Sequence, residues 1–206
     1  CWRTAEMMVV GLTGSIAMGK STTAAMFRAF GWPLFDADRA VHDLMAAGGA
    51  AVAPVLAAFP GVGSLDAGVD RAALGAAVFG DGGALARLEA ILHPRVRHAE
   101  ERFLAHARRR GDRAAVLDIP LLFEGGGWKR CDVTVVASAS AHLQAVRALA
   151  RPGMTRAKLD AILAKQMPDR EKRRRADFVV RTGLGRALAL ADVRGIVRVV
   201  QERENG

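Results

Sequence analysis

The chain has 206 residues, of which 51% are hydrophobic and 25% charged, a balance typical of a soluble globular protein rather than a disordered or fibrous one. Thirty Lys and Arg residues against 21 Asp and Glu give a net charge of +9, which indicates a polyanionic partner such as nucleic acid, anionic lipid or a phosphorylated metabolite. No run approaches the roughly 20 apolar residues that span a bilayer, and Cys1 and Cys131 form neither a disulfide framework nor a metal-binding spacing, so we expect a cytoplasmic protein.

The N-terminal part of the chain predicts a strand-loop-helix-strand unit. Residues 1–6 are expected to be a non-native or disordered extension and are set aside. Met7–Thr13 is a short apolar run, as in a strand covered on both faces. After a glycine-containing loop, Lys20–Phe30 predicts a helix that stops at Gly31. Trp32–Asp38 predicts a second strand, and this order of elements is typical of a parallel α/β fold.

The rest of the chain predicts three more strands among helical stretches. Residues 39–110 are mostly helical, contain no convincing strand and indicate an inserted helical region. The α/β class with a parallel sheet of about five strands is therefore the expected fold. Its later elements are expected to be strands at Ala114–Ile119, Cys131–Ala137 and Phe178–Val180, a basic helical stretch at Ala141–Arg175 and a closing helix at Arg186–Glu204.

A segment between the first strand and the first helix matches the pattern G-x-x-x-x-G-K-[ST] without a mismatch. Glycines let several backbone N–H groups of such a loop point inward, and the helix that follows adds its positive end. Lys20 would reach the β- and γ-phosphates, and the Ser21 hydroxyl would bind Mg²⁺. A glycine-rich turn with an incidental lysine is the alternative. The expected nucleoside triphosphate site comprises Gly14, Ser15, Ile16, Ala17, Met18, Gly19, Lys20, Ser21 and Thr22.

The remaining sequence narrows the class of nucleotide-binding protein. A GTPase needs a base-reading Asn-Lys-x-Asp element, and the only asparagine is Asn205. Motors and helicases are normally longer and carry more motifs. A short chain with an inserted helical region and a late arginine-rich helical stretch favours a metabolite or nucleotide kinase, which must close over both substrates to exclude water.

The chain resembles the dephospho-coenzyme A kinases from about Met8 to Gly183, through several motifs in the same order. The phosphate loop is shared by a superfamily, whereas the Pro-Leu-Leu-Phe-Glu segment is far more particular to these kinases. The motifs are Gly11-Leu12-Thr13-Gly14, Asp36-Ala37-Asp38, His93-Pro94, Asp118-Ile119-Pro120-Leu121-Leu122-Phe123-Glu124, Gln144-x-x-Arg147-x-x-x-Arg151, Gln166-x-Pro168 and Lys172-x-x-x-Ala176-Asp177.

The resemblance implies the last step of coenzyme A synthesis, in which ATP with Mg²⁺ phosphorylates the ribose 3′-hydroxyl of dephospho-CoA. It implies partners that are small molecules, not nucleic acid or a membrane, and a monomer or small homo-oligomer. The implied architecture is a three-layer P-loop NTPase fold in one domain over 7–206. Its parts would be a core at about 7–38, 111–140 and 176–206, a helical acceptor-binding region at about 39–110 and a helical lid at about 141–175.

Two aspartates follow the second predicted strand. At an extended strand end Asp36 and Asp38 would project to the same side, where open α/β sheets place their ligands. The resemblance implies that Asp38 accepts the proton of the acceptor hydroxyl, and that Asp36 supports it or the metal. A helix N-cap is the alternative for either residue, because a helix is expected to begin at Arg39.

Further candidate residues come from the other motifs. Arg147 and Arg151 lie four apart on one helix face, and the resemblance places them in the lid, where Arg151 would contact ATP phosphates and act in catalysis with Lys20. A solvated basic face is the alternative. Asp118 ends a buried strand and would hold Mg²⁺, directly or through water, or else anchor the Pro120 turn. His93 would be a helix-end histidine in isolation; by the resemblance it contacts the acceptor, as do Pro120, Leu121 and Leu122.

The sequence departs from the family at three places. Ser15 and Ala17 stand where many members have glycine, and Ala17 fits only with a negative φ, since a positive φ costs on the order of 1 kcal/mol. Arg181-Thr182-Gly183 replaces the usual acidic or Asn-containing turn.

Two alternatives to this function stay open. Another small-molecule or nucleoside monophosphate kinase would share the loop, the base and the lid. A basic, nucleotide-regulated nucleic-acid-binding protein would use the runs Arg108–Arg110 and Arg170–Arg175, but neither run has interleaved aromatics on which bases could stack.

Overall fold

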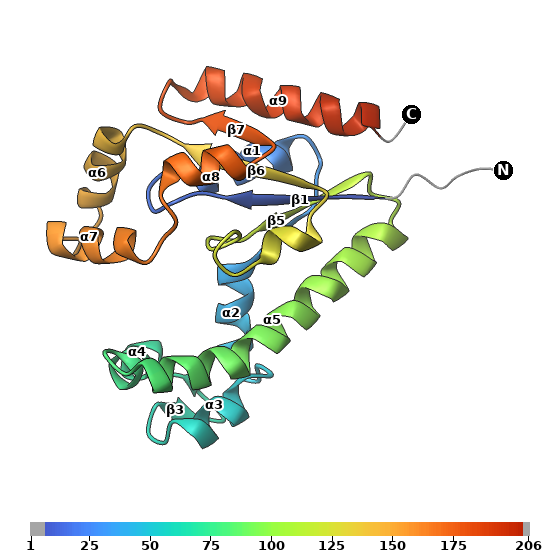
Figure 1. Cartoon of the computed structure of the whole chain (residues 1–206). Helices are drawn as coiled ribbons and strands as arrows, with labels where there is room; N and C mark the ends of the chain where they lie inside the picture. Colours follow the sequence, from blue (N-terminus) through green and yellow to red (C-terminus); the bar gives the residue numbers. More distant parts are fainter. Residues whose placement is uncertain (1–6, 204–206) are drawn as a thin grey trace. The chain divides into compact units, whose positions relative to one another are not determined.

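The computed structural model describes residues 7–203, and residues 1–6, expected to be a non-native or disordered extension, lie outside the described part. The described chain divides into two compact units (Figure 1). We call the unit built from the described parts of 1–35 and 106–206 the core unit, and the unit built from 36–105 the inserted unit. Each is described by itself.

The core unit is built on a five-stranded sheet in the order β2-β5-β1-β6-β7. Strand β1 pairs in parallel with both β5 and β6, and β6 pairs in parallel with β7. The predicted α/β class with a five-stranded sheet is thus confirmed. The strands are β1 (Met8–Thr13), β2 (Leu34–Asp36), β5 (Ala114–Asp118), β6 (Val133–Ser138) and β7 (Phe178–Arg181).

Helices α1 (Lys20–Ala29) and α9 (Arg186–Arg203) cover one face of this sheet, and α9 lies along β7 (Figure 1). Phe27 of α1 is fully buried and stacks on Trp32 with a centroid distance of 5.4 Å. Strands β5 and β6 are buried along their whole length, which is why they read as continuous apolar runs. The shared core of this face consists of Val10, Leu12, Ala24, Met26, Phe27, Trp32, Ala114, Val116, Val133, Val135, Val180, Ala189, Val193, Ile196, Val197 and Val200.

The opposite face of the sheet receives α8 (Asp169–Arg175). Ser138 alternates along β6 with the residues that face α1 and α9, and its hydroxyl donates to Asp169 at 2.7 Å. Helices therefore lie on both faces, as expected for three layers. The basic helical stretch expected at 141–175 is helical and consists of three helices: α6 (Ala141–Leu149), α7 (Arg156–Ala164) and α8. Ser140 and Thr155 cap the first two by accepting backbone N–H groups.

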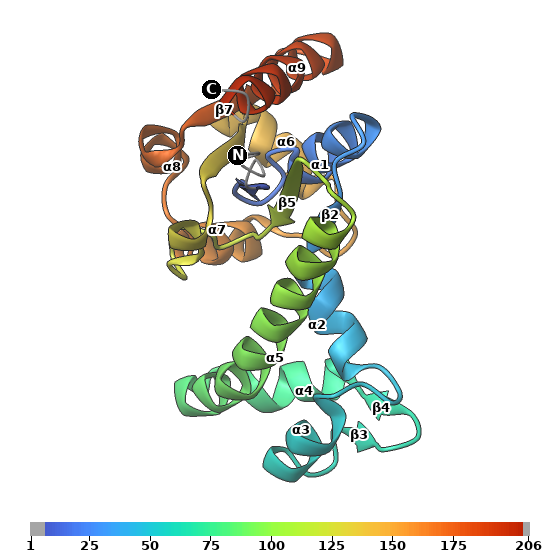
Figure 2. The same cartoon turned by 90° about the vertical axis from the view of Figure 1, so that its right-hand side faces the viewer.

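The inserted unit is mainly helical and has its own apolar core. In it α2 (Ala37–Met45) packs against α5 (Gly82–Arg109) through Met45, Leu88 and Leu92 (Figure 2). The remaining helices are α3 (Val52–Ala58) and α4 (Arg71–Val78). A short antiparallel pair, β3 (Gly63–Ser64) with β4 (Gly68–Val69), stands where no strand was expected.

The hairpin was missed because two-residue strands carry no periodic pattern. Gly63 and Gly68 have φ of +145° and +82°, and a Cβ on Gly63 would lie 2.2 Å from the Gly68 carbonyl oxygen. Only glycine fits such a close approach. Among residues 7–203, no helix is long and apolar enough to cross a bilayer.

Candidate active site

The phosphate loop lies between β1 and α1, as its motif predicts, and two of its glycines are required by close packing. A Cβ on Gly14 would lie 2.8 Å from the Ala137 carbonyl oxygen. Gly19 caps α1 with φ +89°, in the left-handed region, and offers no side-chain hydrogen bond to the helix. The first amides of α1 therefore have no side-chain cap and can bind an anion.

Lys20 and Asp118 form an ion pair inside this site. Lys20 Nζ lies 2.6 Å from Asp118 Oδ1, and the Asp118 side chain is 5% exposed. Pairing of β1 with β5 sets Leu12 opposite Asp118 and so brings the strand end to the loop. Thr13 also holds the Pro120 turn, because its hydroxyl donates to the Pro120 carbonyl at 2.8 Å.

Thr182 supports the loop from behind, in the turn where the sequence departs from the family. Its hydroxyl lies 2.6 Å from the Met18 carbonyl oxygen and 3.1 Å from that of Ser138. A Cβ on Gly19 would meet the Thr182 side chain at 2.9 Å. Arg147 Nη2 donates to the Thr182 carbonyl at 3.0 Å, so this arginine is tied to the turn. Sequence reasoning assigned no role to Thr182, since a lone threonine in a turn carries no signal.

Two glutamines hold the backbone at Ile16. The Ile16 N–H donates to Gln166 Oε1 at 3.1 Å, and Gln144 Nε2 donates to the Ile16 carbonyl at 2.9 Å. Both glutamines belong to motifs that carry the family resemblance, which was the only available sign of their importance. They attach the helical stretch expected to form the lid directly to the phosphate loop.

Ala17 contradicts the expectation of a negative φ. Its φ is +59°, the only positive value among non-glycine residues in the described part of the chain. For an alanine this conformation costs about 1–2 kcal/mol. The Ala17 methyl is buried in a small cluster with Ala148 of α6 and Leu159 of α7, and this contact offsets part of the strain.

A buried ion pair fastens the other end of the predicted lid. Lys172 of α8 is fully buried, and its Nζ lies 2.9 Å from Glu124 Oε1. The Met167 N–H donates to the same oxygen at 2.8 Å. Burial of Glu124 opposes its charged form, but the hydrogen bonds from Lys172 and Met167 outweigh it, so the pKa of Glu124 lies below its ordinary value.

Of the two predicted aspartates, Asp36 is a helix cap. The second strand ends at Asp36 rather than Asp38, and Asp36 Oδ1 accepts the Arg39 N–H at 3.0 Å. Asp38 lies exposed in the first turn of α2. The two residues therefore do not share a strand face, and the expected same-side projection is wrong. A capping Asp36 can still contact a ligand, because only its Oδ1 atom accepts the Arg39 N–H.

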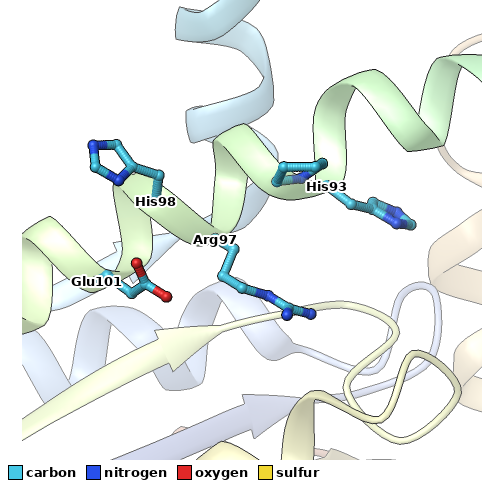
Figure 3. A pocket seen from close by; sticks show the side chains of 5 residues that line it. His93, Arg97, His98 and Glu101 are labelled. Carbon is cyan, nitrogen blue, oxygen red and sulfur yellow. The ribbon is translucent and has the colours of Figure 1, made fainter.

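His93 lies inside α5 and not at a helix end, since the helix continues through Pro94. Next to Pro94, the Arg95 side chain donates to the carbonyls of Ile91 at 2.7 Å and Ala50 at 3.0 Å, and so links α5 to the segment before α3. A pocket of about 390 Å³ opens here (Figure 3). Its lining combines two imidazoles, a guanidinium and a carboxylate, a set suited to phosphorylated or polar ligands. The residues are His93, Pro94, Arg97, His98 and Glu101.

The residues near Pro120 that were expected to contact the acceptor differ in how exposed their side chains are. Leu121 is 46% exposed, whereas Leu122 is fully buried and fills the space beside Gly11. A Cβ on Gly11 would lie 2.8 Å from Leu122 Cδ2. Leu122 is thus a packing residue, and Leu121 is the side chain of the two that a ligand can reach. Arg151, in the turn after α6, is exposed.

The five-stranded α/β sheet, the phosphate loop and the Lys20–Asp118 pair define a P-loop kinase-like site. The family model for dephospho-CoA kinase matches residues 8–185, and the chain belongs to this family. It is 66% identical to a dephospho-CoA kinase of Paramagnetospirillum magneticum over 81% of this chain and 78% of the relative. It is 58% identical to one of Mesorhizobium japonicum over 93% and 95%.

Solved structures agree on the fold. A protein from Thermus thermophilus is 33% identical with a TM-score of 0.82, covering 94% of this chain and 97% of that chain. A dephospho-CoA kinase from Campylobacter jejuni covers the same shares with a TM-score of 0.64 at 22% identity. The chain therefore shares its overall α/β fold with these two solved structures.

Proposed function

We propose that the chain transfers the γ-phosphoryl group of ATP to the ribose 3′-hydroxyl of dephospho-CoA, giving coenzyme A and ADP. The observation that carries this is a complete phosphate loop, with Lys20 held by Asp118, in a chain 66% identical to a dephospho-CoA kinase. Phosphoryl transfer is mainly a matter of positioning and charge neutralisation, and the loop provides both.

The core unit binds ATP in this proposal. Amides of the loop and of the first turn of α1 bind the phosphates, and Lys20 neutralises charge on the β- and γ-phosphates. Asp118 and Ser21 fit a magnesium site. The buried carboxylate of Asp118 lies beside Lys20, and Ser21 directly follows Lys20 in the sequence. Ser21 would bind Mg²⁺ directly and Asp118 through water, and the ion would neutralise phosphate charge. Arg151 adds a guanidinium from the lid.

The inserted unit supplies the acceptor side. Asp38 orients the 3′-hydroxyl and takes its proton late in the transfer, with Asp36 beside it in sequence. His93 and Arg97, which line the α5 pocket of this unit, contact polar groups of dephospho-CoA. The enzyme is cytoplasmic and uses small molecules, not nucleic acid, as its substrates; it is a monomer or small homo-oligomer.

A coupled assay of ADP release tests the proposal across an acceptor panel of dephospho-CoA, adenylate, shikimate and gluconate. Turnover should appear with dephospho-CoA and Mg²⁺ and fall to background in Lys20→Met. Phosphorylation of another acceptor, but not of dephospho-CoA, would overturn the assignment. The product is then digested at its nucleotide part and the fragments are analysed by mass spectrometry. The new phosphate should be on the ribose 3′-oxygen.

A further inference from the structure

The peptide between Ile16 and Ala17 is held in an orientation that its own backbone disfavours. Ala17 has φ +59°, which an L-residue with a Cβ adopts only under constraint. Rotating this peptide plane by about 180° changes ψ of Ile16 and φ of Ala17 together, and would bring Ala17 to the ordinary negative region. Something outside the loop must therefore hold the peptide.

Gln144 is placed to do so. Its Nε2 donates to the Ile16 carbonyl at 2.9 Å, and that carbonyl belongs to the strained peptide. The side chain is 6% exposed, and α6, which carries it, begins with a Ser140 cap. Gln166 acts on the preceding peptide, where it accepts the Ile16 N–H. A rotated Ile16–Ala17 peptide would turn its carbonyl away from Gln144, so the present hydrogen bond from Nε2 would be lost.

The held orientation has a consequence for the nucleotide. In a trans peptide the C=O and N–H point in opposite directions, so the Ala17 N–H points away from Gln144. Within residues 7–203 this N–H donates to no other protein group. Phosphate loops bind phosphate oxygens through such amides.

We propose that Gln144 is a positioning residue that locks the Ile16–Ala17 peptide so that the Ala17 N–H is available to the phosphates of a bound nucleotide. It acts through the loop and touches no substrate. The inference rests on the loop being a nucleotide site and goes beyond the proposed function, which gives Gln144 no role. The proposal also implies that alanine at position 17 carries a cost in backbone strain. Only a residue with a Cβ is strained at this φ, so only such a residue needs Gln144 to hold the peptide.

The test is a double-mutant cycle between Gln144→Met and Ala17→Gly, read as ADP affinity by calorimetry on the full chain. Methionine keeps the length and burial of Gln144 but donates no hydrogen bond, so Gln144→Met should weaken ADP binding about tenfold. Glycine adopts positive φ without strain and keeps the backbone N–H, so Ala17→Gly removes the need for the lock, and its own ADP affinity is the reference for the double variant. Added to Gln144→Met, it should restore most of the lost affinity.

Rescue separates a lock from simple packing. If Gln144 only filled space, Ala17→Gly would enlarge the defect, because it removes a further buried methyl, one that packs with Ala148 of the same helix α6; an unrescued loss of affinity therefore overturns the proposal. Unchanged affinity in Gln144→Met does so too. If Gln144→Met fails to fold, Gln144→Asn, which is too short to reach the Ile16 carbonyl, replaces it in the cycle. ADP binding needs no acceptor, so failure here is distinguishable from a wrong choice of substrate.

Discussion

Most of the proposed chemistry depends on single side chains and backbone groups. Those that a sequence pattern could reveal are close to one another in the chain. The loop from Gly14 to Ser21 is contiguous, so a pattern can reveal it. Gln144, Gln166 and Thr182 contact the loop from 128 to 164 residues away in sequence, and no spacing rule can reveal such contacts. The sequence therefore revealed the groups proposed to bind phosphate, and it gave no role to those that hold the loop in place.

Asp38 gives the clearest prediction at this scale. Asp38→Asn removes the proton acceptor but keeps the size of the side chain, so kcat should fall by about 10²–10⁴-fold while ATP binding changes little. Steady-state kinetics with dephospho-CoA and direct measurement of ATP affinity check both halves. Near-normal turnover would remove Asp38 from the mechanism.

The matched control is Asp43→Asn on the same helix, since Asp43 is also exposed and its contact with Arg39 is long at 3.4 Å. It should leave kcat within about twofold, as exposed pairs contribute little. Asp36 needs a different pair of variants because it caps α2. Asn is an equally good cap, so Asp36→Asn reports on the carboxylate alone, whereas Asp36→Ala also loses about 1 kcal/mol of stability.

At the scale of elements, the strands were predictable and the subdivision of helices was not. Strands β5 and β6 are mostly apolar because they are buried along their whole length. The stretch 141–175 is basic and helix-forming along its length, and its breaks depend on Gly153 and Pro168 acting with the Thr155 cap. The sequence did not predict that Lys172 anchors this stretch. A lysine in a basic run is expected to be exposed, whereas Lys172 is fully buried.

The Lys172–Glu124 pair predicts an asymmetric response to mutation. Glu124→Ala strands a buried ammonium group and should destabilise the fold by about 3 kcal/mol or more, whereas Lys172→Met removes the buried charge itself and should cost less. Denaturant unfolding of both variants and of the double variant checks this, and the double variant should resemble Lys172→Met. Equal losses from the two single variants would show that the buried charge does not set the cost.

The same pair contributes a pH dependence. The pKa of Glu124 is lower in the folded protein than its ordinary value of 4.5. Its contribution is therefore fully present above pH 4.5 and is lost as the pH falls through the lower folded value. In Glu124→Gln this part of the acid-induced loss of stability should disappear, which unfolding curves at a series of pH values will show.

The charge of the whole molecule was the least informative feature of the sequence. The net charge of +9 suggested any polyanion, and it took the phosphate-loop motif and the family resemblance to limit that choice. In the structure Trp32 is buried against Phe27, and the basic run at 173–175 lies on a seven-residue helix anchored by Lys172. In the proposed function, only a few positively charged groups around the loop bind phosphate.

This distribution predicts weak, salt-sensitive binding to nucleic acid. Fluorescence anisotropy with labelled duplex and single strands should show no association at about 0.15 M salt, because solvated arginines without stacking aromatics provide only counterion release. ATP affinity should change far less over the same salt range, since Lys20 and Asp118 are 16% and 5% exposed and screening is weak there. Tight nucleic-acid binding at that salt, with a slope that reports several displaced counterions, would contradict the assignment of the basic surface. Lys20→Met separates the two sites: it should abolish ATP binding and leave any residual nucleic-acid binding unchanged, because one charge of the loop contributes little to a delocalised surface potential.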